Sequence, residues 1–333
     1  MENKIHESVM LPKFTLMKQP NKVTYASYDY SAVQQKVFAF IMLYLQDSIN
    51  QLFVNKSLQV NQLSLFKDDS KVEITLVLSN FCNSANYKEF IQSVRLMASA
   101  LIKFPDRKGS NGLIYGGEGH LISSIHYPKV KHKKEILICL DKAVVEDLLI
   151  IKNGYTRFSY EIILTAKNKY TGRIYQLICR WRDTGGFRLK YSDLRSMLSI
   201  DEDKYKTWKD FKKRVIVPVQ AELTERADVW FEVELEKGEN SKYLNFKVIT
   251  SEQMAVLNKK KDSIMELLKH HFGYSVEDYK DISVYLLRPH IFNDLHLKLI
   301  DLFEIIKLNN SIKHIPSYIN AAIIKEFKGR LKL

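Results

Sequence analysis

Apolar residues recur at intervals of three and four along residues 204–226, which read KYKTWKDFKKRVIVPVQAELTER. This spacing puts them on one face of a helix and predicts that the helix docks against a core. The apolar face consists of Trp208, Phe211, Val215, Val219 and Leu223. At about 100° per residue the opposite face is mostly cationic. That face comprises Lys206, Asp210 and Lys213, with Lys209 and Arg214 on its flanks and Lys212 nearer the apolar boundary.

Further patterns flank this helix on both sides. Residues 228–236 and 242–250 alternate apolar and polar positions, which predicts a hairpin. Upstream, residues 187–191 predict a short strand, and Ser192 is the predicted N-cap of a short helix. Strand, short helix, turn, basic helix and hairpin follow in the order of a winged helix. An outward basic helix in such a unit suits the DNA major groove, although an ordinary solvated helix face has the same pattern.

The first half of the chain repeats this order of elements without repeating its residues. The predicted elements are a core helix at 31–49, a strand at 72–78, a long helix at 86–104 that Pro105 and Gly109 end, and hairpin strands at 113–125 and 135–140. We therefore expect two winged helices in tandem, joined through residues 141–160.

The tip of the first predicted hairpin is basic. It carries Lys129, Lys131, Lys133 and Lys134. These side chains would lie along DNA phosphates if the tip acts as a wing. A solvated loop explains them equally well.

Beyond residue 251 the sequence shows helical periods alone. The helical segments are 251–270, 275–287, 290–308 and 314–328. The expected fold is therefore α+β, with two tandem winged-helix domains and a small C-terminal all-helical extension. The expected boundaries are an N-terminal arm at 1–24, the first winged helix at 25–150, the second at 151–250 and the extension at 251–333.

Composition supports a nucleic-acid partner. The 333 residues are enough for two or three domains, and a hydrophobic fraction of 46% is ample for packed cores. The formal net charge of +13 favours an anionic partner, because basic proteins release counterions when they bind nucleic acid. A membrane surface is also compatible with this charge.

The chain has the features of a soluble cytoplasmic protein with no membrane partner. No apolar run approaches the roughly 20 residues of a membrane helix, and the N-terminus lacks the apolar core of a signal peptide. Cys82, Cys139 and Cys179 are far apart and sit among apolar neighbours. They predict buried thiols in a reducing compartment.

No motif predicts catalysis. There is no GxxxxGK loop followed by Ser or Thr, and the histidines form neither HExxH nor the His-hydrophobic-His pair of a rolling-circle nickase. Residues 116–119 read GGEG, but they lie inside the predicted hairpin, so we interpret them as a turn or bulge. We expect no enzyme activity, no metal and no cofactor.

Several segments together resemble the plasmid replication initiator (Rep) proteins of the iteron-binding, tandem winged-helix kind. The similarity covers most of residues 20–250, and its second half is the more specific. The segments are NKVTYASYDYSAVQQKVFAFIMLYLQ (21–46), RFSYEIILTAKNKYTGRIYQLICRW (157–181), LRSMLSIDEDKYKTWKDFKKRVIVPVQAEL (194–223) and the hairpin up to Phe246.

This resemblance implies roles for individual residues. The basic helix is implied to read repeated origin DNA through Tyr205, Lys206, Lys209, Phe211, Lys212, Lys213 and Arg214. The first domain is implied to contact the other half of each repeat and to mediate dimerisation. Such proteins often carry a basic residue after the wing glycine, whereas Glu239 follows Gly238 here, which argues against a phosphate contact from this wing.

The expected function is a plasmid replication initiator. It would bind direct repeats in double-stranded origin DNA, help to open the origin and recruit a host helicase or helicase loader. We expect it in the bacterial cytoplasm, associated with plasmid or nucleoid, in a monomer–dimer equilibrium. Two alternatives are a winged-helix transcriptional repressor without a replication role and an origin-nicking relaxase. Replication of an origin plasmid in cells that supply the protein would distinguish an initiator from a repressor. A metal-dependent cut in supercoiled origin DNA would identify a relaxase.

Overall fold

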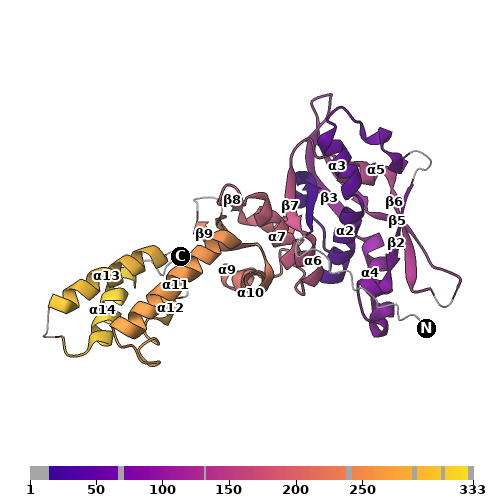
Figure 1. The fold of residues 1–333 in the computed structure, drawn as a ribbon. Helices are drawn as coiled ribbons and strands as arrows, with labels where there is room; N and C mark the ends of the chain where they lie inside the picture. The colour runs from indigo at the N-terminus through magenta and orange to yellow at the C-terminus, as the bar shows by residue number, and fades with distance from the viewer. Residues whose placement is uncertain are drawn as a thin grey trace. The chain divides into compact units, whose positions relative to one another are not determined.

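The computed structural model describes residues 15–66, 71–130, 133–237, 242–286, 291–308 and 312–328. The chain divides into two compact units, Met1–Val248 and Ile249–Leu333 (Figure 1). Helices and strands are mixed in the first unit, whereas the described elements of the second unit are helical beyond Thr250, where the last strand ends.

The first winged helix surrounds helix α2. Its elements are α1 (Asn21–Tyr25), α2 (Ala32–Tyr44), α3 (Gln46–Val54), β2 (Lys71–Val77), α4 (Tyr87–Ser99), β5 (Ile122–His126), β6 (Glu135–Asp141) and α5 (Lys142–Leu149). Ser31 starts α2 with a capping box that includes Gln34. β2 buries alternate residues, as its pattern predicts, in a three-stranded antiparallel sheet of order β2-β6-β5.

The second winged helix has the same topology. Its elements are α6 (Tyr160–Thr165), α7 (Thr171–Arg180), β8 (Gly186–Lys190), α8 (Tyr191–Met197), α9 (Trp208–Phe211), α10 (Val217–Arg226), β9 (Val229–Lys237) and β10 (Lys242–Thr250). Its sheet has the order β8-β10-β9. In both domains the strand before the long helix pairs with the second strand of the hairpin, which confirms the tandem winged-helix α+β fold.

The N-cap of the short helix α8 lies two residues earlier than predicted. Lys190 is its N-cap residue and makes no side-chain cap, and the hydroxyl of Ser192 lies 3.1 Å from the carboxylate of Asp193. Ser192 is therefore not the N-cap.

The predicted arm is a strand from Leu16 on. β1 (Leu16–Pro20) pairs antiparallel with β7 (Tyr155–Ser159) in a two-stranded sheet. Met17 is fully buried in the core of the second winged helix, whereas its neighbours Leu16 and Lys18 are exposed and partly buried, respectively. The rest of the predicted arm up to residue 14 lies outside the described residues.

The predicted long helix at 86–104 is too long. α4 ends at Ser99, and β3 (Leu101–Lys108) continues the chain and pairs with β4 (Ile114–His120). Leu101 to Phe104 alternate in burial, so a period of two overrides the helical one. Pro105 lies in β3, at a register shift between Phe104 and Arg107.

The predicted first hairpin is also split at Leu121, because β4 belongs to the β3 sheet and β5 to the β6 sheet. Residues 117–119 are paired within β4, with Gly117 opposite Phe104 and Gly119 opposite Ile102. The register shifts between Phe104 and Arg107, opposite Gly116, so the segment adjoins a bulge, as one of the two predicted forms. The other predicted form, a turn, is wrong, because the segment lies within a strand.

Arg173 on α7 ties the two winged helices together in the interior. Its guanidinium donates to Tyr28 Oη at 2.7 Å and to the carbonyls of Thr24, at 3.2 Å, and Ala26. It also stacks over the Tyr28 ring, 4.0 Å from the centroid. These carbonyls end α1, where a helix leaves its acceptors unsatisfied. A buried cation of the second core therefore caps a helix of the first.

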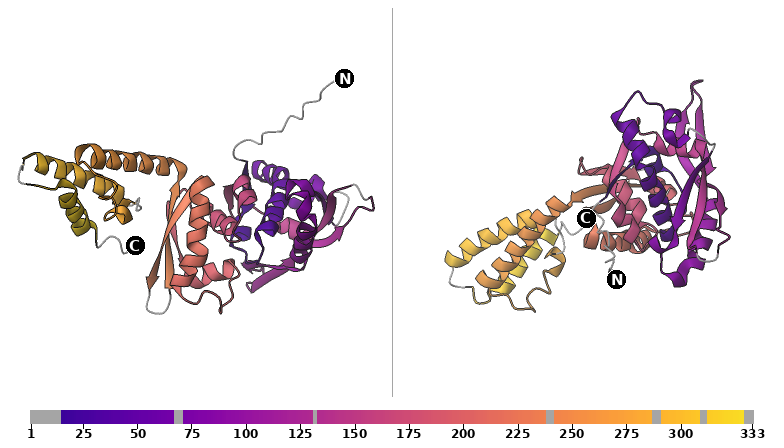
Figure 2. Two further views of the ribbon diagram at one scale, coloured as in Figure 1. Left: turned by 90° about the horizontal axis from the view of Figure 1, so that it is seen from below. Right: turned by 45° about the vertical axis from the view of Figure 1, so that its right-hand side comes forward.

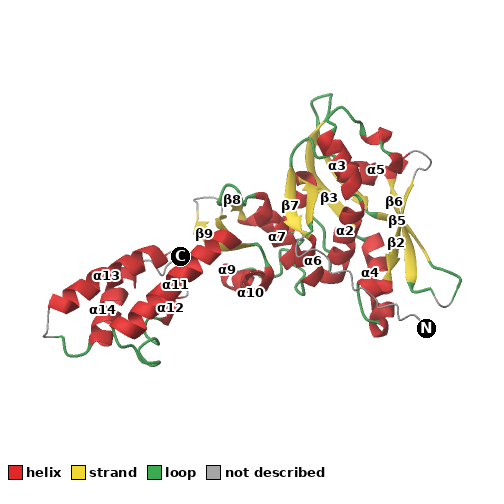
Figure 3. Ribbon diagram, viewed as in Figure 1, coloured by secondary structure: helices red, strands yellow, loops and turns green. Residues whose placement is uncertain are grey.

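The C-terminal unit is a small helical domain (Figure 3). Its helices are α11 (Ser251–Glu266), a π-helical turn (Leu267–His271), α12 (Ser283–Leu286), α13 (Phe292–Leu308) and α14 (Ile315–Phe327). The predicted helix at 275–287 is mostly turns, because Asp278 accepts bonds from the backbone and hydroxyl of Ser275 at 2.8 and 2.6 Å. Leu268, Leu295, Leu299, Ile319 and Ile323 are fully buried in its core.

Within the described ranges, no single helix has the length and apolar composition to cross a membrane; α2 and α3, bent by 45°, pass that test only as a pair. Cys139 and Cys179 are buried, as predicted, whereas Cys82 is partly exposed.

Candidate nucleic-acid interface

The basic helix is held firmly by its apolar face. It runs through α9, a π-helical turn (Lys212–Ile216) and α10 without a break, and it begins at Trp208, where Thr207 Oγ1 accepts from the backbone N–H of Asp210 at 3.1 Å. The apolar face of α9 and α10 is buried in the second core, as predicted. The left view of Figure 2 shows the β9–β10 hairpin beside this helix.

Pro218 lies inside this helix, a feature that the apolar period does not reveal. Proline has no N–H, and its ring clashes with the carbonyl four residues earlier, here that of Arg214. The π-helical turn immediately before α10 accommodates it. The wider turn also helps to keep the apolar residues of this helix, which are four positions apart, directed at the core. In a regular α-helix, residues four positions apart are rotated by about 40° relative to one another.

The predicted DNA-binding cations of this region are available at the surface. Lys206, Lys209, Lys213 and Arg214 are exposed, and Lys212 is partly buried. Within the part of the chain that the structure describes, none of the five side chains has an ion-pair or hydrogen-bond partner. They can therefore meet phosphates without first breaking an interaction. Lys206 lies in the loop before the helix, not on its face.

Phe211 and Tyr205 face the protein. Phe211 is fully buried, so it anchors the helix and does not reach DNA. Tyr205 is partly buried against the second core. Its side chain lies against Tyr170, whose pKa is raised by burial and further by the nearby Tyr205.

Arg195 on α8 organises the loop that leads into the basic helix. It donates to the carbonyls of Asp201, Lys204 and Tyr205 at 2.6, 2.7 and 3.0 Å. Tyr205 has a φ of +48°, in the left-handed region that non-glycine residues rarely occupy. In the same loop a hydrogen bond from Lys204 lowers the pKa of Asp201. The hydrogen bonds of Arg195 therefore hold a strained turn and fix the start of the helix.

We expect an Arg195→Met protein to bind DNA about tenfold more weakly with an unchanged salt dependence. The strain of one such turn is about 1–3 kcal/mol, and releasing the loop would misplace the helix while its phosphate-binding cations remain. Titration of labelled DNA at several salt concentrations measures both quantities, with Lys206→Met as the control that lowers the salt slope. A lower slope for Arg195→Met as well would show that Arg195 itself touches DNA.

Helix α4 holds in the first winged helix the place of the basic helix in the second. Lys88, Gln92 and Arg95 lie on its exposed side, four and three residues apart. Arg95 Nε donates to Tyr127 Oη at 2.8 Å, and Tyr127 immediately follows β5 in the hairpin. These residues are not among those predicted from the sequence, although polar positions opposite Phe90, Val94 and Met97 were the available signal.

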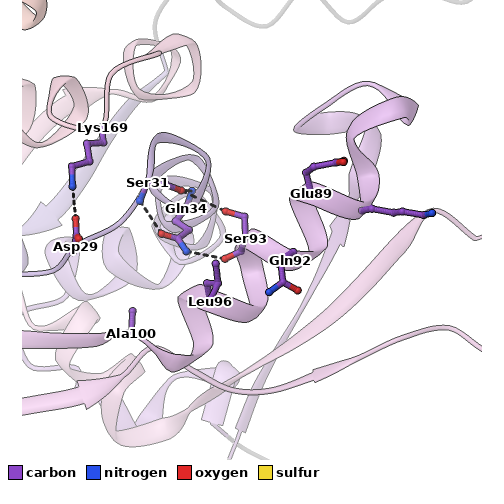
Figure 4. A pocket seen from close by; sticks show the side chains of 10 residues that line it. Asp29, Ser31, Gln34, Glu89, Gln92, Ser93, Leu96, Ala100 and Lys169 are labelled. Carbon is purple, nitrogen blue, oxygen red and sulfur yellow. Dashed lines mark hydrogen bonds and ion pairs between the residues drawn. The ribbon is translucent and has the colours of Figure 1, made fainter.

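A groove of about 740 Å³ opens beside α4 (Figure 4). Gln92 and Leu96 line one side of it, and the ion pair of Lys169 with Asp29, 2.7 Å long, lines the other. Because Lys88 and Glu89 also line it, the groove has no net preference for an anion. It lies next to the candidate DNA-reading helix of the first domain and adds no cationic surface.

The two wings are described only in part. Lys129 and Lys133 are exposed in the first hairpin, and Lys133 pairs with Glu135 at 3.4 Å. Lys131 lies outside the described residues, as does the tip of the second hairpin with Gly238 and Glu239.

On β8, which pairs with the second hairpin through β10, Arg188 is already engaged. Its guanidinium donates to both carboxylate oxygens of Glu236 at 3.1 and 3.0 Å and stacks on Tyr243, with its carbon 3.6 Å from the ring centroid. This arginine supports the sheet.

No group of three or more His, Cys, Asp or Glu side chains that could hold a metal ion occurs in the described ranges.

Two family models match the chain. Residues 16–179 match the model "Initiator Replication protein, WH1", and residues 190–249 match "Initiator Rep protein, WH2". The two matches cover more than half of the chain and follow the order of the two winged helices. The first match extends through α6 and most of α7, whose apolar residues pack in the second core. No curated protein matches the sequence significantly. The chain therefore belongs to the winged-helix plasmid replication initiator (Rep) proteins.

Proposed function

We propose that this initiator binds direct repeats in the double-stranded DNA of a plasmid origin through the first half of its basic helix. The observation that carries the proposal is the set of exposed cations Lys209, Lys213 and Arg214 on a helix whose other face is buried, together with Lys206 in the loop before it; none of them has a partner among the described residues. Lysine supplies phosphate contacts, and arginine can also bind the acceptor edge of guanine. The exposed side of α4, with Gln92 and Arg95, would contact the other half of each repeat.

After binding, the protein would help to open the origin and recruit a host helicase or helicase loader. This role is non-enzymatic. The separate C-terminal unit supports a division of labour, because the second winged helix completes its sheet at β10 without it. A nicking assay on supercoiled origin DNA with divalent cations tests the non-enzymatic part.

We also propose a monomer–dimer equilibrium. Val145, Leu148 and Leu149 on α5 are fully buried in the first core. If this segment packs differently in the dimer, its apolar face must leave that core. Sedimentation across a wide concentration range, with and without one repeat, measures the equilibrium.

The test of the proposed function compares the full chain with a protein that ends at Thr250. We expect both to give the same footprint on cloned direct repeats, since the proposed DNA contacts precede residue 250. We expect only the full chain to maintain an origin plasmid in cells. Protection of scrambled DNA equal to that of the repeats would contradict repeat recognition.

A truncated protein that replicates the plasmid would refute a separate role for the C-terminal unit. Normal footprints with no replication by the full chain would favour the alternative, a repressor with no role in replication.

A further inference from the structure

Helix α13 has two apolar faces, and among the described residues only one of them packs in the core of its unit. Leu295, Leu299 and Leu302 point into the core and are 3% exposed or less. On the other side large aliphatic side chains face solvent. They are Leu297 at 60% exposure, Ile300 at 42%, Ile305 at 45% and Leu308 at 88%.

The exposed residues form one strip. At about 100° per residue, the four residues fall within an arc of about 140°, opposite the buried leucines. From Leu297 to Leu308 the strip is about 16 Å long, or about three helical turns. Isolated exposed leucines are common, but a strip of four on one helix face marks an interaction surface.

The polar residues within this arc give the strip its charge. Asp301 and Glu304 lie between the aliphatic residues, and among the described residues Asp301 has no partner. Glu304 pairs with Lys307 at 3.3 Å, in an exposed contact at the edge. Lys298 is turned away, toward Glu326 on α14 at 3.3 Å. The strip is therefore apolar with an acidic centre.

We propose that this strip, Leu297–Ile300–Ile305–Leu308 with Asp301, is the docking surface for a basic amphipathic helix of a partner protein. An apolar stripe flanked by Lys or Arg would cover the aliphatic residues and meet the acidic centre. DNA is a poor occupant, because Asp301 and Glu304 would repel phosphates. A second copy is also a poor occupant, since pairing two such strips opposes acidic residues in either direction.

This inference deepens the recruitment step of the proposed function and rests on it for its biological role. Binding is measured without DNA, however, so the docking surface and origin recognition can fail independently.

The probe is a synthetic helical peptide of about 18 residues, with a leucine stripe flanked by lysines, and its counterpart with glutamates in place of the lysines. Both are labelled and titrated with the full chain at low salt. We expect the lysine peptide to bind at least about tenfold more tightly than the glutamate peptide, because charge complementarity selects partners.

Three variants of the full chain assign the binding to the strip. Leu297→Ser should weaken binding of the lysine peptide about tenfold, since docking would remove the apolar surface of this leucine from water. Asp301→Lys should invert the preference, so that the glutamate peptide binds better. Val276→Ser is the matched control, because Val276 is 85% exposed and lies outside α13.

Unchanged binding by Leu297→Ser, equal binding of the two peptides, or no binding of either would each overturn the proposal. Sedimentation of the full chain tests the alternative that a second copy of the chain occupies the strip. A dimer that Leu297→Ser dissociates, without any peptide selectivity, would assign the strip to a second copy. In cells, Leu297→Ser should lose plasmid maintenance while its footprint on the repeats stays normal.

Discussion

A Lys213→Glu protein should bind origin repeats at least about tenfold more weakly than the unchanged protein, and its affinity should depend less steeply on salt. Removal of one bound phosphate lowers the slope of log affinity against log salt by about 0.9, which equals about tenfold in affinity at 0.1 M salt. Lys213 is exposed on the basic helix and has no partner to lose among the described residues. Binding to labelled repeats, measured from about 0.05 to 0.3 M salt, gives both quantities.

Lys56→Glu is the matched control, because it makes the same change in net charge at an exposed loop position after α3. Its salt slope should stay close to that of the unchanged protein. If both variants weaken binding equally, net charge and not the helix governs affinity. If Lys213→Glu binds normally while folded, the helix does not face DNA. A change at a position that reads a base would instead cost about 1–3 kcal/mol at one base pair only.

Arg173→Met should lower the free energy of unfolding of the first unit by about 3 kcal/mol. Arg173 is 5% exposed, and its removal leaves the carbonyls of Thr24 and Ala26 and the hydroxyl of Tyr28 without this donor. Each buried polar group left unsatisfied costs about 1–3 kcal/mol, which the relief of a buried charge partly offsets. The substitution also removes the stacking of the guanidinium on the Tyr28 ring.

Chemical denaturation followed by tryptophan fluorescence measures this decrease, since the described tryptophans all lie in the first unit. Arg188→Met is the matched control, because that guanidinium pairs with Glu236 in a half-exposed site. Exposed pairs contribute less than about 1 kcal/mol, so this variant should change stability far less. Equal decreases from the two variants would show that Arg173 does not join the two winged helices.

The elements predicted well from the sequence are those with a strong local period. The basic helix repeats its apolar residues every three or four positions, and β9 and β10 alternate regularly, so each pattern has one reading. These elements define the second winged helix and most of the candidate DNA surface. The cations on the helix followed from the same period, because the apolar face fixes where the other face points.

The elements predicted poorly depend on partners far along the chain. β1 is short and ends in proline, and it becomes a strand because β7 lies beside it. The stretch from Leu101 reads as the end of a helix until its pairing with β4 is known. Arg173 and Arg195 look like ordinary surface arginines in the sequence, since nothing local shows that their acceptors are backbone carbonyls. Hydrogen bonds between a side chain and backbone carbonyls leave no periodic pattern in the sequence.

The residues that stabilise the basic helix and the exposed residues on its other face are different sets. This separation affects how the sequences of such initiators diverge. Phe211, Val215 and Val219 set the stability of the helix and do not touch DNA, whereas Lys209 and Lys213 are exposed and hold nothing in the fold. Substitutions at the exposed positions can therefore accumulate with little loss of folding free energy. If this face reads the repeats, as proposed, a plasmid lineage could acquire a new origin sequence by changing this face alone, and two plasmids that share one fold could replicate side by side under separate control.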